Sequence, residues 1–368
     1  MLNRIKALSF VLILVICSPA VKAQSVNKFN VIAYFSGKPE QLEKYDPKKI
    51  SHIIFCFGHL KDNKFNIGNK TDSAMIRKMV DMKKVNPQLK VLVSLGGWGG
   101  CKTCSDVFSA KEGRREFAES VKKVLTGFKA DGIDLDWEYP AIEGFPEHKY
   151  SPEDKNNFTE LVKQLRETLG KKAIITFAAG GFQKYLDESV DWKSVMRSVD
   201  LVNLMSYDLI NGYAVETGHH TALYSTPKQV ESTDNAVKYL INKAGVDPRK
   251  IIIGAAFYAR IWENVPPENN GLYQPGKFKT SVDYKKFPEN LSDKNGFEYH
   301  WDDTAKAPYM YNRDKKLFAT FDDKRSIALK TEYVMENNLG GIMFWELGLD
   351  TPSDGLLDTI IETGKEAK

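Results

Sequence analysis

The sequence predicts a (β/α)8 TIM barrel that carries a small α+β insertion between its seventh and eighth strands. Eight short runs rich in β-branched and aromatic residues recur along the chain, and most are apolar throughout, as expected for strands buried on both faces of a parallel sheet. Amphipathic helical patterns fill several of the gaps, which favours a barrel over a doubly wound open sheet. One gap, from Ala259 to Gly340, spans about 80 residues, so an additional element is inserted there.

The strands are taken in chain order. Each is a run of apolar and β-branched residues that ends near glycine, proline or a polar segment. The eight runs are "FNVIAYF" (29–35), "ISHIIFCF" (50–57), "KVLVSLGGW" (90–98), "DGIDLDWEY" (131–139), "AIITFAAGG" (173–181), "VDLVNLMSYD" (199–208), "KIIIGAAFYA" (250–259) and "GGIMFWE" (340–346).

The clearest predicted helix begins with Ser151 as its N-cap and Pro152 at its first helical position, and it ends at Gly170. An apolar stripe at helical spacing supports it. Further helices are predicted at about 72–85, 113–128 and 324–338. The stripe consists of Phe158, Leu161, Val162, Leu165 and Leu169.

The long gap changes composition after the seventh strand. "NVPPENNGLYQPGK" is followed by short runs rich in tyrosine and phenylalanine. We therefore interpret residues 260–317 as a small lobe on the rim of the barrel, which interrupts a catalytic domain spanning residues 24–368.

Residues 1–23 have the pattern of a secretory signal peptide. Arg4 and Lys6 precede the apolar run "ALSFVLILVIC", and "VKA" before Gln24 fits a cleavage site with small residues. The apolar run of 11 residues is too short for a membrane anchor, which needs about 20. A lipid anchor on Cys17 is the other alternative, although the preceding residue is not small. We expect a secreted protein, either extracellular or periplasmic.

The charge balance gives little support to nucleic-acid or membrane-surface binding. Loss of the signal removes three basic residues and no acidic ones, which lowers the formal charge from +4 to +1. Basic residues are interleaved with acids rather than gathered in a block. A hydrophobic content of 42% is enough for a full-sized core, and a charged content of 27% argues against disorder.

Three cysteines remain after the signal: Cys56, Cys101 and Cys104. The last two, in "GGCKTC", suit a local disulfide or two free thiols. A zinc site would need two further ligands, and the histidines stand at no metal-binding spacing, since His219 and His220 are adjacent and the others are scattered. We therefore predict neither a metal nor a cofactor.

Three carboxylates occupy every second position of the run "DGIDLDWEYP". Side chains two apart on a strand point the same way, so Asp134, Asp136 and Glu138 share one face. In a barrel that face is the interior, and the strand end before Pro140 lies at the C-terminal mouth, where barrel active sites form. Like charges buried so close together cannot all ionise, so a proton is shared along the row. Glu138, at the exposed end, suits a general acid.

Two other interpretations of the row are open. In an edge strand facing water, the three acids would simply be solvated, but a strand in the middle of a barrel is buried on both faces. Carboxylates also bind calcium or magnesium, but three acids on one strand encircle an ion poorly and no EF-hand pattern is present.

The acid row resembles the D-x-x-D-x-D-x-E signature of family-18 glycoside hydrolases, the chitinase family. Other strand ends are similar to motifs of the same family: "SLGGW" (94–98) on the third strand, "MSYD" (205–208) on the sixth, and "FYAR" and "MFWE" on the seventh and eighth. The resemblance extends from about residue 29 to 360. The inserted lobe falls where many chitinases carry an additional domain.

This resemblance implies a role for each matching residue. Glu138 would be the general acid and then the base, Asp136 would orient the acetamido group of the substrate, and Asp134 would share the proton of Asp136. Tyr207 would hydrogen-bond the acetamide oxygen, and Asp131 would be structural. Flat side chains suit sugars because pyranose rings present apolar C–H faces, although each aromatic residue alone also fits core packing. The implied sugar-binding residues are Tyr34, Phe57, Trp98, Met205, Asp208, Tyr258, Arg260 and Trp345.

We therefore expect a secreted, monomeric chitinase that cleaves β-1,4 bonds of N-acetylglucosamine polymers. Asp136 and Glu138 leave the strand on the same side, so Asp136 is badly placed as a nucleophile. The acetamido oxygen of the substrate serves instead, with retention of configuration. An endo-β-N-acetylglucosaminidase acting on N-glycans is one alternative, and a chitin-binding lectin is another, although such lectins typically lose the glutamate that Glu138 matches. The expected partner is chitin or its oligosaccharides, with no nucleic acid and no membrane span.

Overall fold

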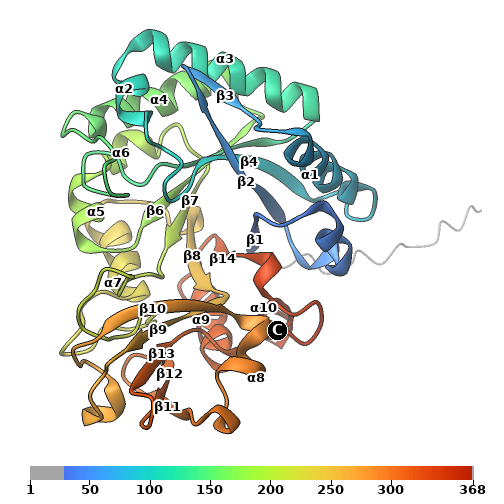
Figure 1. Ribbon diagram of the computed structural model, residues 1–368. Helices are drawn as coiled ribbons and strands as arrows, with labels where there is room; N and C mark the ends of the chain where they lie inside the picture. Colours follow the sequence, from blue (N-terminus) through green and yellow to red (C-terminus); the bar gives the residue numbers. More distant parts are fainter. Residues whose placement is uncertain (1–28, 367–368) are drawn as a thin grey trace, which may run out of the picture.

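The structure is a computed structural model that describes residues 29–366 (Figure 1). The predicted signal peptide and its cleavage site before Gln24 lie outside the described residues. Within the described range, no helix is both long enough and apolar enough to cross a membrane.

Eight parallel strands form a closed barrel, as the sequence predicted. Strand β1 pairs with both β14 and β2, which joins the two ends of the sheet and excludes an open, doubly wound sheet. Each of the eight predicted runs supplies one strand. In barrel order they are β1 (Asn30–Phe35), β2 (His52–Lys61), β4 (Lys90–Gly96), β5 (Gly132–Asp136), β6 (Ile174–Gly180), β7 (Leu201–Met205), β8 (Ile251–Ala256) and β14 (Gly341–Trp345). A short strand, β3 (Lys64–Asn66), extends β2 as a hairpin.

Helices surround the barrel. They are α1 (Lys70–Asp81), α2 (Cys104–Ser109), α3 (Lys111–Phe128), α4 (Asp154–Leu169), α5 (Gln183–Glu188), α6 (Trp192–Val195), α7 (Thr233–Lys238), α9 (Lys324–Glu336) and α10 (Leu356–Glu366). The predicted start of α4 is wrong by two residues. Ser151 and Pro152 form a preceding turn, in which the Asp154 side chain accepts from the Ser151 backbone N–H at 2.9 Å. The Ser151 hydroxyl donates to the Glu153 side chain at 2.6 Å, so it does not cap the helix.

The two faces of the barrel strands enter different cores. On β5, the side chains of Ile133 and Leu135 belong to the large apolar core that includes residues of the surrounding helices. Asp134, between them, and Asp136, after Leu135, therefore point the other way, because successive side chains alternate across a strand. That direction is the barrel interior, where Ile32 and Met343 belong to a smaller cluster. The alternation places the acid row inside the barrel.

The part of the chain that connects β8 to β14 forms a second sheet, which is the orange lobe of Figure 1. Its strands are antiparallel in the order β10-β9-β13-β12-β11: β9 (Tyr258–Glu263), β10 (Lys277–Asp283), β11 (Glu298–Asp302), β12 (Ala307–Asn312) and β13 (Leu317–Thr320), with the short helix α8 (Phe287–Asn290). The predicted insertion of 260–317 falls on this sheet. The chain leaves the barrel after Ala256, so Tyr258 and Arg260 belong to the lobe and not to the seventh barrel strand.

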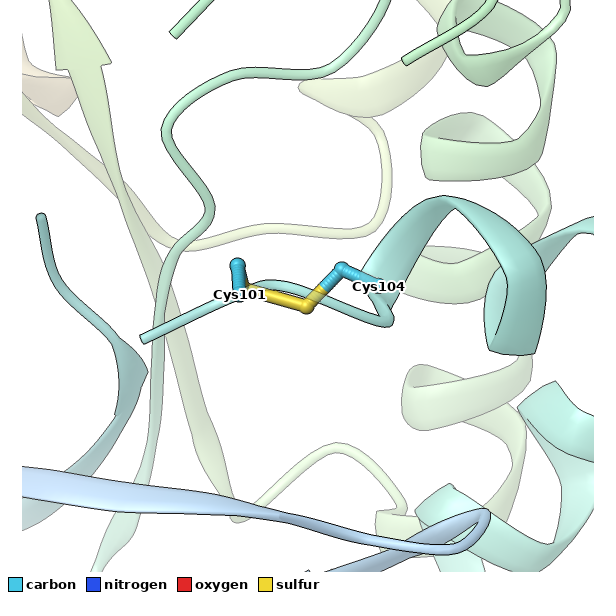
Figure 2. Close-up of a disulfide and its surroundings, with 2 residues drawn as sticks. All are labelled: Cys101 and Cys104. Atoms are coloured by element: carbon cyan, nitrogen blue, oxygen red, sulfur yellow. A yellow bond between two sulfur atoms is a disulfide. The ribbon is translucent and has the colours of Figure 1, made fainter. Parts of the chain in front are cut away.

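Cys101 and Cys104 form a disulfide between β4 and α2, with their Cα atoms 5.1 Å apart (Figure 2). Both are buried, and Cys104 is the first residue of α2. Of the two arrangements that the sequence left open, the structure has the disulfide. Cys56 is a buried free thiol.

Candidate active site

The acid row runs from the barrel interior to its mouth. Exposure rises along it, from 0% for Asp134 to 4% for Asp136 and 9% for Glu138, so Glu138 is the most accessible of the three although it is still buried. Strand β5 ends at Asp136, so Glu138 lies two residues past the strand and not on it as predicted. The row thus combines two fixed strand residues with an acid in the loop at the mouth.

Asp134 accepts four hydrogen bonds from four different strands. Its Oδ2 accepts from Ser94 at 2.8 Å and from Tyr34 at 3.2 Å, and its Oδ1 accepts from Thr176 at 2.6 Å and from Asn203 at 3.1 Å. Register explains two of these contacts, because Ser94 and Thr176 are the residues directly beside Asp134 on β4 and β6. Burial raises the pKa of Asp134, while these four donors oppose the increase.

Asp136 lies against the glycines that end β4. A Cβ on Gly96 would come within 2.2 Å of the Asp136 carbonyl oxygen, and Gly96 has a φ of +106°, so only glycine allows this approach. The Gly97 N–H donates to the same carbonyl at 2.9 Å. The "GG" of "SLGGW" therefore brings the third strand close to the acid row.

The Asp136 carboxyl is the member of the row with a free acceptor. Its Oδ1 is buried and makes no hydrogen bond within the described part of the chain. Burial and the nearby charges of Glu138 and Asp134 raise its pKa well above the usual range. A proton on Asp136 is thus favoured, but no hydrogen bond joins it to Asp134 among the described residues, so the predicted proton sharing stays a prediction.

Glu138 has the pKa of a general acid that works near neutral pH. Burial raises this pKa, an interaction with Tyr139 opposes the increase, and the negative charge of Asp208 adds to it, which leaves it at about 7. A carboxyl group with this pKa holds its proton in mildly acidic solution and can release it during a reaction.

Tyr207 and Asp208 follow β7, two strands along the barrel from β5, and the charge of Asp208 acts on Glu138. Tyr207 is 9% exposed, and its ring contacts Tyr258 edge to face at 6.3 Å. Asp208 accepts from the Tyr258 hydroxyl at 2.8 Å and from two nitrogens of Arg260. Burial alone would raise the pKa of Asp208, but the hydrogen bonds and charge of Arg260 hold it well below its usual range. The lobe thus fixes Asp208 as a carboxylate.

Aromatic residues gather at the same end of the barrel. The rings of Phe57 and Trp345 stack with their centroids 5.6 Å apart, and the centroid of the Tyr34 ring lies 6.0 Å from that of Trp345. Trp98 is 46% exposed and is the most accessible of the predicted sugar-binding residues. Tyr34 is only 2% exposed, and its hydroxyl donates to Asp134. In this structure it therefore contacts the acid row and has little surface open to a ligand. Met205 ends β7 and is partly buried.

Several residues that contact the site were not predicted. Ser94, Thr176 and Asn203 hold Asp134, and their polar side chains within apolar strand runs were the available signal. Tyr213 is 64% exposed, and its ring lies 6.3 Å from that of Trp98. No sequence motif marked it.

No group of three or more histidine, cysteine, aspartate or glutamate side chains is arranged to hold a metal ion within residues 29–366. The acid row and its surroundings offer proton transfer from Glu138, a hydrogen-bonding carboxyl in Asp136, and neighbouring rings on which a sugar can stack. Together with the barrel, these features define a glycoside hydrolase.

Comparisons with known proteins give the family. The model of glycosyl hydrolases family 18 matches residues 30–350, and the chain belongs to this family. Chitinase A1 of Niallia circulans is 28% identical over 402 residues, which cover 89% of this chain and 57% of that protein. This chain spans between 44% and 57% of the length of several such curated relatives.

Solved structures agree with this assignment. A family-18 N-acetylglucosaminidase from Paenibacillus barengoltzii has a TM-score of 0.83 and 37% identity, covering 91% of this chain and 99% of that one. Chitinase ChiA74 from Bacillus thuringiensis has a TM-score of 0.84 and 28% identity, covering 92% of this chain and 70% of that one. The acid row, the aromatic residues and Tyr207 are thus present in a chain of established family.

Proposed function

We propose that this protein is a secreted chitinase that hydrolyses β-1,4 bonds between N-acetylglucosamine units, using the acetamido group of the substrate as the nucleophile. The observation that carries the proposal is the acid row, in which Glu138 has a pKa of about 7 and Asp136 has an unpaired buried oxygen. Relatives named as chitinases support the choice of polymer.

Glu138 protonates the glycosidic oxygen and later, as a carboxylate, removes a proton from the incoming water. Its pKa of about 7 suits both directions of transfer. A two-carboxylate retaining mechanism needs the nucleophile across the sugar from the acid, and family 18 is a known exception to that rule. The charge of Glu138 acts on Asp136, so the two carboxyl groups lie close together, and in our proposal Asp136 lies beside the acid and not across the sugar from it.

The acetamido oxygen attacks the anomeric carbon in our proposal. Asp136, through its free oxygen, hydrogen-bonds the acetamido N–H, and Tyr207 donates its hydroxyl to the acetamido oxygen. Among the described residues, the Tyr207 hydroxyl has only a long contact of 3.8 Å to the sulfur of Met343, so it is available to a stronger acceptor. Holding the nucleophile within the substrate makes the attack intramolecular, which favours it strongly.

Six of the predicted sugar-binding residues fall into three groups in this proposal. Trp345 forms the floor under the sugar at the cleavage point, with Phe57 stacked against it. Asp208, with Tyr258 and Arg260 of the lobe, holds the sugar from the side of β7 and keeps a negative charge near Glu138. Trp98, the exposed ring, extends the stacking surface away from the cleavage point.

A second candidate is release of single N-acetylglucosamine units, because the Paenibacillus barengoltzii structure, with 37% identity, is described as an N-acetylglucosaminidase. Product analysis separates the two. Digestion of N-acetylglucosamine hexamers by a chitinase releases dimers and trimers early, whereas an N-acetylglucosaminidase releases monomers from the first time point. An N-glycoprotein treated in parallel tests for endo-β-N-acetylglucosaminidase activity. Failure to cleave any chitin oligomer would refute the proposal.

A further inference from the structure

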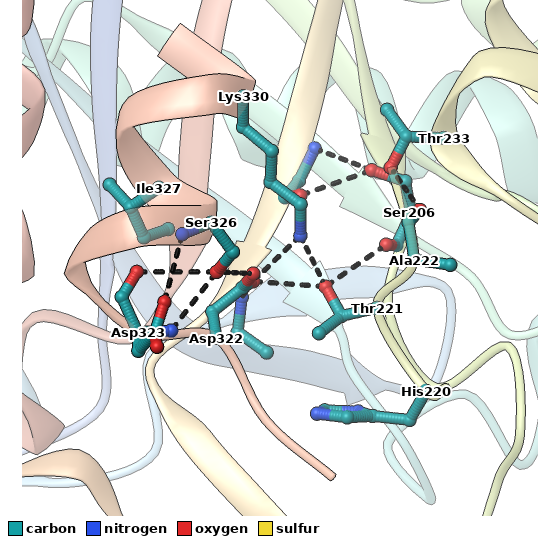
Figure 3. Close-up of polar contacts among 12 residues, drawn as sticks. Ser206, His220, Thr221, Ala222, Thr233, Asp322, Asp323, Ser326, Ile327 and Lys330 are labelled. Atoms are coloured by element: carbon teal, nitrogen blue, oxygen red, sulfur yellow. Dashed lines mark hydrogen bonds and ion pairs between the residues drawn. The ribbon is translucent and has the colours of Figure 1, made fainter. Parts of the chain in front are cut away.

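A buried ion pair lies next to the end of strand β8, outside the acid row. Lys330 of α9 and Asp322, just after β13, are both 0% exposed, and the Lys330 ammonium contacts the Asp322 carboxylate at 2.7 Å. Asp322 also accepts from the Ala256 N–H at 3.0 Å and from the Ser326 hydroxyl at 2.7 Å. Figure 3 shows the ammonium group between Asp322 and Thr221. The pair thus ties helix α9 and the end of the lobe to the end of β8.

Thr221 connects this pair to the catalytic side of the barrel. Its hydroxyl donates to Asp322 at 2.9 Å and accepts from Lys330 at 2.5 Å. The same hydroxyl proton also reaches the carbonyl oxygen of Ser206, the residue before Tyr207, at 3.4 Å, as the weaker branch of a three-centre hydrogen bond. Burying two charges costs free energy, and hydrophobic residues of similar volume often stabilise a fold equally well. We therefore explain the pair by the positions in which it holds Thr221 and the end of β8.

Ser206 holds the stretch of β8 backbone on which the Tyr207 ring packs. The Ser206 hydroxyl accepts from the Gly254 N–H at 2.9 Å and donates to the Gly254 carbonyl at 3.1 Å, so it holds both polar groups of one β8 residue. A Cβ on Gly254 would come within 2.8 Å of the Tyr207 ring. The ring therefore packs directly on the backbone that Ser206 holds, and a shift of Ser206 moves the surface under Tyr207.

His220, the residue before Thr221, contacts the other end of the turn that runs from Ser206 to Leu209. The His220 carbonyl accepts from the Leu209 N–H at 3.0 Å, and the His220 ring contacts Asp208 at 3.4 Å. Asp208 has a φ of +55°, a backbone conformation that costs a residue other than glycine free energy and persists only where its surroundings impose it. Residues 220 and 221 thus hold the turn from Ser206 to Leu209 at both ends.

We propose that Thr221, anchored by the Asp322–Lys330 pair, is a positioning residue for the reaction: its hydroxyl fixes the turn that presents Tyr207 and Asp208 to the substrate. This inference rests on the proposed function, because it assigns the turn a role in placing the acetamido group. Helix α9, which carries Lys330, thereby contributes to catalysis without touching the sugar.

The test compares hydroxyl-deleting and hydroxyl-keeping variants at one position in the full-length enzyme. Thr221→Val keeps the shape and removes the hydroxyl, while Thr221→Ser keeps the hydroxyl and removes a methyl group. Thr221→Ala is the size-matched partner of Thr221→Ser and carries the test if the valine variant does not fold. Thr331→Val is the control, because Thr331 is buried on α9 and its hydroxyl donates only to the Ile327 carbonyl. Circular dichroism and the melting temperature establish folding for each variant.

Steady-state kinetics on N-acetylglucosamine oligomers then give the answer. We expect the valine and alanine variants to lose about tenfold or more in kcat with a smaller change in KM, because misplacement of a positioned group acts on the reacting geometry. The serine variant should keep most of its kcat, and Thr331→Val should stay within about twofold of the wild type in kcat. A folded Thr221→Val with unchanged kcat, or a serine variant as impaired as the alanine variant, would overturn the inference. An inactive wild-type enzyme would overturn the proposed function as well.

Discussion

Replacement of Glu138 by glutamine tests the role of the acid through both rate and pH dependence. Glutamine keeps the shape of the side chain but carries no transferable proton. General acid catalysis contributes about 10²- to 10⁴-fold, or about 3 to 5 kcal/mol of the barrier, so kcat should fall by that factor. The pKa of about 7 also predicts how strongly kcat/KM depends on pH. The wild-type acid is about 90% protonated at pH 6 and about 10% at pH 8, so kcat/KM should fall about tenfold per unit above pH 7.

The pH profile distinguishes this role from a loss of structure. Because glutamine does not titrate, the residual activity of Glu138→Gln should lack the decline between pH 6 and pH 8. Glu143→Gln, an exposed acid in the same loop, is the matched control and should keep both the rate and the profile. Initial rates on a chromogenic N-acetylglucosamine oligomer, with the melting temperature of each variant, measure both effects. Activity within about threefold of wild type, or an unchanged decline above pH 7, would refute Glu138 as the acid.

Two further predictions concern stability. Asp134→Ala removes the acceptor of four buried hydrogen bonds and should lower the free energy of unfolding by about 2 to 4 kcal/mol, measured by denaturant titration; a change below about 0.5 kcal/mol would contradict the role assigned to those donors. Cys101→Ser opens the short loop to Cys104 and should cost about 2 kcal/mol relative to the oxidised wild type, and the reduced wild type should show the same loss. A reduced wild type as stable as the oxidised protein would contradict it.

The barrel strands and the acid row could be predicted because their signals are local. Each strand is a continuous apolar run, and each run reappears as one parallel strand. The alternation of Asp134 and Asp136 with apolar neighbours placed the acids on one face, and the structure puts the neighbours in the outer core. The resemblance to the family added the residues at other strand ends, which no periodicity marks.

Contacts between distant strands could not be predicted from local patterns. Thr176 and Asn203 reach Asp134 through the strand register and barrel closure, which the sequence does not state. The exit of the chain from the barrel after Ala256 was missed because the apolar run continues to residue 259 without a turn signal. The Asp322–Lys330 pair was not predicted, because these two charged residues stand in no motif and become buried only through tertiary packing.

The stereochemistry of cleavage tests the proposed mechanism most directly. Proton NMR can follow the anomer first released from an N-acetylglucosamine oligomer, and the same reaction can be run on the fully deacetylated oligomer. Attack by the acetamido oxygen predicts that the β-anomer appears first and that deacetylated chains are cleaved at a far lower rate, because they lack the nucleophile that Asp136 and Tyr207 hold. Initial release of the α-anomer, or equal rates on the two substrates, would contradict it.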